Sequence, residues 1–175
     1  MKCFKKYVVM FLAALLITGL FAPAAQAATS VTAKRCVHTE TLKTIKKYAA
    51  KVKPGTTNLK VKMGEGYLKF TAPRTKTYKF TFSNVTGKYT MDGYVQFYRM
   101  DKADKKHVET FNVSTKGGKT DILYLAINGV EHQGGKLKTR PLQKRTGSVK
   151  LKKGQVIYMY YQATPAHSTC KLVIK

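Results

Sequence analysis

The feature that most constrains the fold is the stretch 66–85, GYLKFTAPRTKTYKFTFSNV, in which apolar and polar residues alternate. A period of two places alternate side chains on opposite faces of a β-strand. Each half of the stretch therefore has one apolar face and one face rich in Lys and Thr, and Pro73 with the residues after it marks a turn between the halves. The side chains predicted to face inward are Leu68, Phe70, Tyr78, Phe80 and Phe82. We expect two strands joined by a short turn, with the rest of the chain covering their apolar face.

The first 27 residues have the pattern of a secretory signal peptide. Lysines at positions 2, 5 and 6 precede an apolar run over 8–20, and Ala25-Gln26-Ala27 offers small residues for cleavage after Ala27. An uncleaved membrane anchor is the alternative, but the apolar run is short for a span of about 20 residues. Cleavage would remove three lysines and no acids and lower the net charge from +25 to +22. The sequence thus predicts a secreted or cell-surface protein with no membrane span after cleavage.

Two cysteines, Cys36 and Cys170, remain after the predicted cleavage. In an oxidising compartment such a pair predicts one disulfide, which would tether an N-terminal segment (28–55) to the last strand of the domain that follows (56–175). Closing a loop of this size contributes up to about 5 kcal/mol in the chain-entropy model. Two alternatives stay open: both thiols are free, or Cys36 is a nucleophile assisted by His38, which would need a third group to hold the base.

Most of the chain after Pro54-Gly55 is typical of β-structure. Before it, apolar residues at 42, 45, 49 and 52 suit one face of a short helix within 39–52, with extended chain as the alternative, and 28–35 is expected to fray. Beyond it, short strands separated by Gly, Asn and Asp turns predict an all-β antiparallel sandwich or barrel. In addition to those in 66–85, the expected strands are 59–63, 94–100, 108–114, 122–127, 148–151, 155–162 and 169–174.

Two of these strands, 123–127 and 156–161, are apolar on both faces. Such a strand is usually central and needs a cover on its outer face. The N-terminal segment, a partner or a ligand could each supply that cover. The stretch 134–145, GGKLKTRPLQKR, is the most basic part of the chain, and Pro141 argues against a central strand there. The candidate binding surface therefore comprises the strand tyrosines and this basic loop: Tyr158, Tyr160, Tyr161, Lys136, Lys138, Arg140, Lys144 and Arg145.

Three stretches together resemble a known family. They are YLKFTAP followed by YKFTF (67–73 and 78–82), LKKGQVIY (151–158) and the closing CKLVI (170–174). They are similar to the strands of the secreted bacterial pre-peptidase C-terminal (PPC) β-sandwich, over about residues 59–175. The resemblance implies an antiparallel, jelly-roll-like sandwich without catalytic residues, of the kind that accompanies secreted enzymes or surface proteins. This chain departs from the pattern because no enzyme domain is attached and Cys170 replaces a frequent aromatic residue.

Motifs for catalysis or cofactor binding are not found. The four histidines lack metal-ligand spacing, the eight acidic residues lie mostly in turns, and no nucleophile elbow, P-loop or zinc-protease motif occurs. We therefore predict a non-enzyme with no cofactor and no metal. An enzyme of another type would need a concave pocket that gathers histidine and carboxylate side chains.

The net charge is the strongest chemical feature, because +22 on 148 residues favours polyanionic partners. The simplest alternative is that lysines on the solvent face keep a β-sheet from aggregating. Export argues against nucleic acid, whose binding would also need the charge gathered into one patch. We predict a binding or structural module that associates with the cell surface through an anionic wall polymer or a polysaccharide. The other hypothesis is an accessory or inhibitory protein that binds another secreted protein.

Overall fold

The computed structural model describes residues 28–38, 40–61, 63–86, 92–125, 130–133, 136–139, 144–164 and 168–175. The predicted signal peptide (1–27) and Arg140 lie outside this part of the chain, and so does most of the loop that contains Arg140. Within the described part, no helix is long and apolar enough to cross a membrane.

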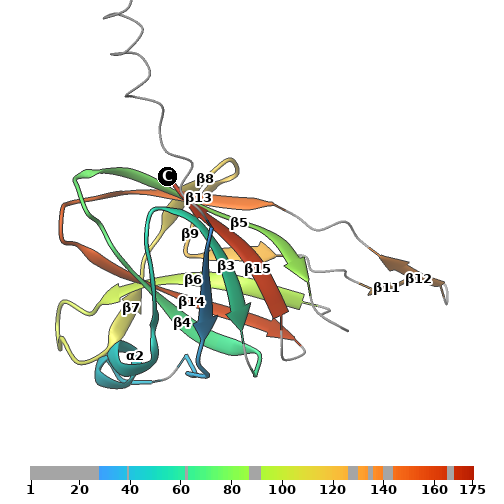
Figure 1. Cartoon of the computed structure of the whole chain (residues 1–175), viewed down its shortest axis with the longest axis horizontal. Coiled ribbons are helices and arrows are strands. Elements are labelled where there is room, and N and C mark those ends of the chain that lie inside the picture. Colours follow the sequence, from blue (N-terminus) through green and yellow to red (C-terminus); the bar gives the residue numbers. More distant parts are fainter. Residues whose placement is uncertain are drawn as a thin grey trace, which may run out of the picture.

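Two β-sheets pack face to face and confirm the all-β sandwich (Figure 1). The seven-stranded sheet has the order β1 (Thr29–Ala33), β3 (Gly55–Val61), β15 (Ser168–Ile174), β5 (Lys76–Thr86), β13 (Arg145–Leu151), β8 (Val113–Thr115) and β9 (Gly118–Thr120). The six-stranded sheet has the order β10 (Ile122–Leu125), β6 (Asp92–Met100), β14 (Val156–Thr164), β4 (Glu65–Thr71) and β2 (Ala50–Val52), with β7 (Val108–Thr110) also paired to β6. A separate two-stranded sheet pairs β11 (Val130–Gln133) with β12 (Lys136–Thr139).

The strand order is that of an eight-stranded jelly roll. When strands β3, β4, β5, β6, β10, β13, β14 and β15 are numbered 1 to 8 in chain order, one sheet has the order 1-8-3-6 and the other 2-7-4-5. Consecutive strands thus alternate mostly between the two sheets, as two Greek keys require. Residues that are neighbours in a sheet therefore come from distant parts of the chain.

The N-terminal segment adds one strand to each sheet and makes both sheets mixed. β1 pairs in parallel with β3, and β2 pairs in parallel with β4, whereas the other strands pair antiparallel as expected. The expectation that 28–35 frays was wrong, because β1 lies within it. Parallel neighbours need a long crossover connection. α2 (Leu42–Tyr48) and β2 lie in the connection between β1 and β3, and β3 lies in the connection between β2 and β4. The predicted short helix is confirmed. Thr41 caps its N-terminus, where its side chain accepts a hydrogen bond from the Thr44 amide.

The interior of the sandwich contains the predicted apolar face of 66–85. Leu68, Phe70, Tyr78, Phe80 and Phe82 are all fully buried. The Phe70 and Phe80 rings meet edge to face at 5.3 Å, and Phe80 meets Phe97 of β6 at 5.9 Å, so aromatic contacts join the two sheets. The period-two pattern therefore identified the correct inward side chains.

Two other predicted elements differ from the structure. The expected strand 108–114 is divided into β7 on the six-stranded sheet and β8 on the seven-stranded sheet. Phe111, between them, stays bonded to β6 through its amide and the Phe97 carbonyl (3.1 Å) before the chain crosses to the other sheet. The basic stretch expected as a loop contains β12, and its pair with β11 stands away from the two large sheets (Figure 1).

The predicted disulfide between Cys36 and Cys170 is not formed, and both residues are buried free thiols. Cys170 packs between the two sheets with Leu172 and Ile174. Cys36 packs instead with Leu42 and Ile45 in a second apolar cluster on the outer face of the six-stranded sheet. A whole sheet therefore separates the two sulfur atoms, and closing the bond would require the fold to open.

We expect thiol titration of the protein, denatured without reductant, to find both Cys36 and Cys170 reactive. Burial, with Glu40 and Glu65 nearby, raises the pKa of Cys36 to about 11, so its thiol stays protonated and slow to oxidise at neutral pH. The free energy of unfolding should be the same with and without reductant. A protein without titratable thiols that loses a few kcal/mol of stability on reduction would contradict this arrangement.

Candidate functional site

The three tyrosines predicted as a binding surface are buried. Tyr158 is 3% exposed, and Tyr160 and Tyr161 are fully buried, so the prediction that they form an exposed surface was wrong. Tyr161 points between the sheets, where its hydroxyl meets that of Ser168 at 3.1 Å. Tyr158 and Tyr160 point to the outer face of the six-stranded sheet, which is covered. The apolar character of both faces of β14 reflects two buried layers.

The cover is the N-terminal segment, one of the possibilities that the sequence left open. Leu42 and Ile45 of α2 pack on the outer tyrosines. The Tyr67 hydroxyl donates to the His38 carbonyl (3.2 Å), and the Leu42 amide donates to the Lys106 carbonyl in the loop after β6 (2.7 Å). These contacts attach the segment to the sheet by both apolar packing and hydrogen bonds.

Glu65 links the cover to the aromatic layer beneath it. One of its carboxylate oxygens accepts from the Tyr160 hydroxyl, and the other lies 3.4 Å from the Arg35 guanidinium. Burial, and then the hydrogen bond to Glu65, raises the pKa of Tyr160 well above its ordinary value. Burial likewise raises the pKa of Tyr98 to about 12, with Tyr94 and Asp121 adding to the shift. The tyrosine layer is therefore neutral, packed and internally bonded.

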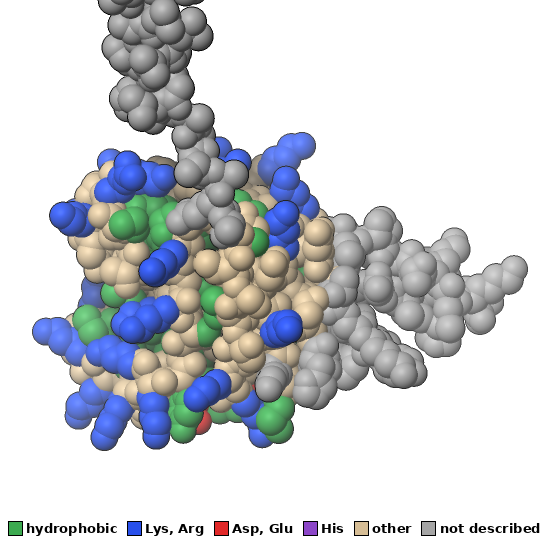
Figure 2. Space-filling model, viewed as in Figure 1, with side chains coloured by type: hydrophobic (Ala, Val, Ile, Leu, Met, Phe, Trp, Pro, Cys, Tyr) green, Lys and Arg blue, Asp and Glu red, His purple; other side chains and the backbone are tan. Residues whose placement is uncertain are grey.

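The outer face of the seven-stranded sheet has a different composition. Its strands contain no Asp or Glu, whereas they contain seven basic residues, and the outward positions between these are mostly Ser, Thr and Asn. Five of them occupy outward positions: Lys60, Lys79, Lys119, Lys150 and Lys171. Lys76 and Arg145 lie at strand ends, opposite the inward residues Leu151 and Phe82. Figure 2 shows Lys and Arg side chains distributed over this side of the molecule, with acidic colour visible only at its lower edge. We call this surface the lysine face.

The acidic side chains that the structure describes lie elsewhere. Glu65 and Glu109 belong to the six-stranded sheet, Glu40 to the segment that covers it, and Asp101 and Asp104 to the β6–β7 loop. Asp121 lies between β9 and β10 and is bonded to β6 through Gln96 and Phe97. The jelly-roll topology thus keeps the described acidic side chains off the strands of the seven-stranded sheet, although both signs of charge are interspersed along the sequence.

Strand register brings lysines of distant sequence together on the lysine face. Lys60 is opposite Thr169, which makes Lys171 its diagonal neighbour. Lys79 is opposite Ser148, which makes Lys150 its diagonal neighbour. Diagonal neighbours lie about 7–8 Å apart and like charges at this range repel each other. The face therefore keeps a repulsive arrangement that no Asp or Glu of its own strands neutralises.

Protection of a sheet edge does not explain this arrangement. Edge protection places charges on the outermost strand, where unpaired backbone groups are open to another chain. The edge strand β1 has the sequence TSVTA, without a charge. Four of the lysines instead lie on β3, β15, β5 and β13, which are paired on both sides.

A groove of about 700 Å³ continues from the lysine face around the β8–β9 edge to β10. We call it the edge groove. Four cationic side chains line it, Lys79, Lys116, Lys144 and Arg145, together with Tyr124. Tyr124 is 64% exposed and lies beside Tyr94, with ring centres 6.4 Å apart. The remaining lining consists mainly of hydroxyl side chains: Ser114, Thr115, Thr120, Thr146 and Ser148.

The edge groove contains part of the predicted binding surface. Lys144 and Arg145 line it, as the basic stretch suggested, whereas the side chains of Lys136 and Lys138 and all of Arg140 lie outside the described part of the structure. Tyr124 was not predicted as a site residue. Its strand looked apolar on both faces, and only the position of β10 at the end of the sheet exposes the outward ring.

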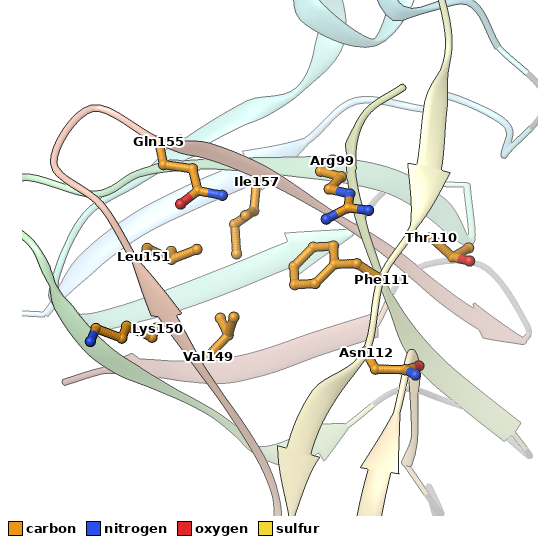
Figure 3. A pocket seen from close by; sticks show the side chains of 9 residues that line it. All are labelled: Arg99, Thr110, Phe111, Asn112, Val149, Lys150, Leu151, Gln155 and Ile157. Carbon is orange, nitrogen blue, oxygen red and sulfur yellow. The ribbon is translucent and has the colours of Figure 1, made fainter. Parts of the chain in front are cut away.

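A second pocket, of about 530 Å³, opens between the sheets where β13 and β14 diverge (Figure 3). Phe111, Val149 and Ile157 point into it, and Arg99 lies at its rim. The Arg99 guanidinium is 2.6 Å from the Glu109 carboxylate, so its charge is already paired. Besides Arg99, its lining contains one cationic residue, Lys150, so the pocket offers an anion fewer partners than the edge groove does.

Neither space gathers the side chains of acid–base or metal chemistry. The described lining of both is without His, Cys, Asp and Glu. Across the described residues, no group of three or more such side chains is placed to hold a metal ion. The chemistry that these surfaces offer is that of cations, hydroxyl groups and one exposed phenol ring.

No protein-family model matches the chain, and comparison with curated proteins finds no relative. The resemblance to the PPC sandwich therefore stays a prediction, and the function is argued from the surfaces themselves.

We expect the free energy of unfolding to fall above about pH 10 because of the buried tyrosines. The unfolded phenol ionises near 10.0, whereas folded Tyr98 holds its proton to a pKa of about 12. Its contribution is complete below pH 10 and is lost as the pH rises from 10 toward 12. Tyr98→Phe should reduce the slope between these values by up to about 1.4 kcal/mol per pH unit, measured by urea unfolding.

Tyr124→Phe is the matched control, because the Tyr124 side chain is solvated in both the folded and the unfolded chain. It should leave the slope unchanged. Equal slopes in the Tyr98→Phe variant and the unsubstituted protein would show that the tyrosine layer is accessible to water, against the cover described above.

Proposed function

We propose that this protein is a secreted, non-catalytic binding module that attaches to anionic polymers at the cell surface through the lysine face. The observation that carries the proposal is the absence of acidic residues from one sheet: none of its seven strands contains an Asp or a Glu. The N-terminal pattern of residues 1–27 supports export, and the net charge of +25 for the whole chain supports an anionic partner.

The spacing of the lysines suits a ligand with repeated charges. Neighbouring strands lie about 4.8 Å apart and alternate residues on a strand about 6.8 Å apart. A flexible polymer with one charge per repeat can therefore meet several lysines at once, and each added contact acts on a chain that is already held. Single contacts of this kind are weak in water and screened by salt, so we expect binding that is multivalent and salt-sensitive.

The exposed apolar side chains are few and scattered, which favours a polymer over a protein partner. The large apolar side chains exposed in the described structure are Met63, Met100 and Tyr124, which lie in the β3–β4 turn, on β6 and on β10. A protein-binding site usually has a buried apolar centre within a polar rim. Among the described residues the continuous feature is instead the lysine face.

The test compares two triple variants with the same change in charge. Lys60→Gln/Lys79→Gln/Lys171→Gln alters the lysine face, whereas Lys43→Gln/Lys46→Gln/Lys47→Gln alters exposed lysines of α2 over the other sheet. Each lysine near a polyanion contributes about 0.5–1 kcal/mol, so the first variant should bind poly(glycerol phosphate) about tenfold more weakly or worse. The second should change the affinity less than threefold.

Binding is measured by sedimentation or calorimetry at low salt, with thermal unfolding as the check on folding. It should disappear between about 0.05 and 0.5 M salt as screening shortens the range of the charges. Equal losses of affinity in the two variants would show that net charge alone, rather than the lysine face, determines binding. No binding at low salt by the unsubstituted protein would refute the proposal.

A further inference from the structure

We propose that the edge groove binds one phosphate-bearing sugar unit of the polymer, and so gives the lysine face a specific subsite. This inference rests on the proposed function and adds the chemical class of the repeat that is recognised. The groove differs from the rest of the face because it is concave, includes an arginine and includes an exposed aromatic ring.

Arg145 is positioned to receive the phosphate. Its Nε donates to the Tyr124 carbonyl oxygen (3.0 Å), which fixes the plane of the guanidinium and leaves the terminal nitrogens for an oxyanion. Lys79, Lys116 and Lys144 line the same space, and no Asp or Glu does. Because the Arg145 side chain is tied to β10, which belongs to the other sheet, the cations face a groove with walls from both sheets.

The hydroxyl groups of the groove suit the sugar part of the ligand. Thr115 donates to the Gly118 carbonyl (2.9 Å), Thr120 to the Ile122 carbonyl (2.9 Å) and Ser148 to the Ser114 carbonyl (3.2 Å). A hydroxyl whose proton is already donated can only accept further hydrogen bonds. Thr115 and Thr120 each accept one already, from the Gly117 and Ile122 amides, so each can accept one more. A phosphate diester offers no protons, but sugar hydroxyls do. The groove therefore combines donors for an oxyanion with acceptors for hydroxyl groups.

Tyr124 adds an apolar surface for a sugar ring. Its side chain is exposed on β10, and its backbone carbonyl accepts from Arg145, so both residues lie at the same part of the groove. An aromatic ring offers a flat apolar face with a polar edge, which suits a molecule with both kinds of surface.

Close packing behind the groove holds its walls in place. A Cβ atom on Gly147 of β13 would lie 2.7 Å from Val113 Cγ2 and 3.4 Å from Leu123 Cδ1. Strand β13 thus approaches both β8 and β10 as closely as a residue without a side chain allows. The groove is formed before a ligand arrives, so little ordering accompanies binding.

The experiment is an NMR titration of the full chain without its signal peptide. The probes are glucose 6-phosphate, glucose, inorganic phosphate and glucuronate. Glucose 6-phosphate should bind at least tenfold more tightly than each of the others, and the shifted amides should concentrate at residues 114–124 and 145–148. Equal affinity for phosphate would overturn the sugar part, and equal affinity for glucuronate would overturn the choice of phosphate.

Variants separate this inference from the proposed function. Arg145→Gln and Tyr124→Ala should each weaken glucose 6-phosphate at least fivefold, and so should Lys116→Gln/Lys144→Gln, whose side chains are exposed and not part of the core. The matched control is Lys60→Gln/Lys171→Gln, on the lysine face but outside the groove, which should leave this monomer unaffected while it weakens the polymer. If the groove variants bind the monomer normally while the lysine-face variants lose the polymer, the subsite is refuted and the polymer-binding function stands.

Discussion

The structure depends on the need to bury both faces of the six-stranded sheet. Strand β14 is apolar on each side, so one side packs on the seven-stranded sheet and the other must be shielded from water. The N-terminal segment supplies that shield with α2 and attaches an edge strand to each sheet. Once this sheet is covered on both sides, the broad sheet surface left to solvent is the lysine face. The location of the cover therefore decides where binding can occur.

Local alternation predicted which side chains are buried. It did not predict whether they lie between the two sheets or in the layer under α2. The inward set of 66–85 was correct because a strand with one polar face has only one way to bury its apolar residues. Cys36 and Tyr160 show the limit of that reasoning. Both are buried, as expected for a cysteine and a strand tyrosine, but they lie under α2 on the outer face of the six-stranded sheet. Cys170 and Tyr161 lie between the two sheets. The predicted disulfide and tyrosine surface failed because the pattern does not show that a second buried layer exists.

The candidate site was predictable in part for the same reason. The solvent-facing positions of Lys60, Lys79 and Lys150 follow from alternation, and the importance of Lys144 and Arg145 follows from the basic stretch around them. The strand order alone brings Lys60, Lys79 and Lys150 together with Lys171 on a surface without acidic residues, because it places β15 between β3 and β5. Exposure of Tyr124 likewise depends on β10 being the end of its sheet. Long-range pairing, rather than any local motif, creates the surface.

The most direct test of the account is to map which lysines the polymer covers. Amine acetylation of the folded protein, with and without poly(glycerol phosphate), gives the protection of each lysine by mass spectrometry. We predict protection of Lys60, Lys79, Lys150 and Lys171, with Lys43, Lys46 and Lys47 equally reactive in both samples. Uniform protection of both groups, or protection confined to the α2 lysines, would contradict a binding surface on the seven-stranded sheet.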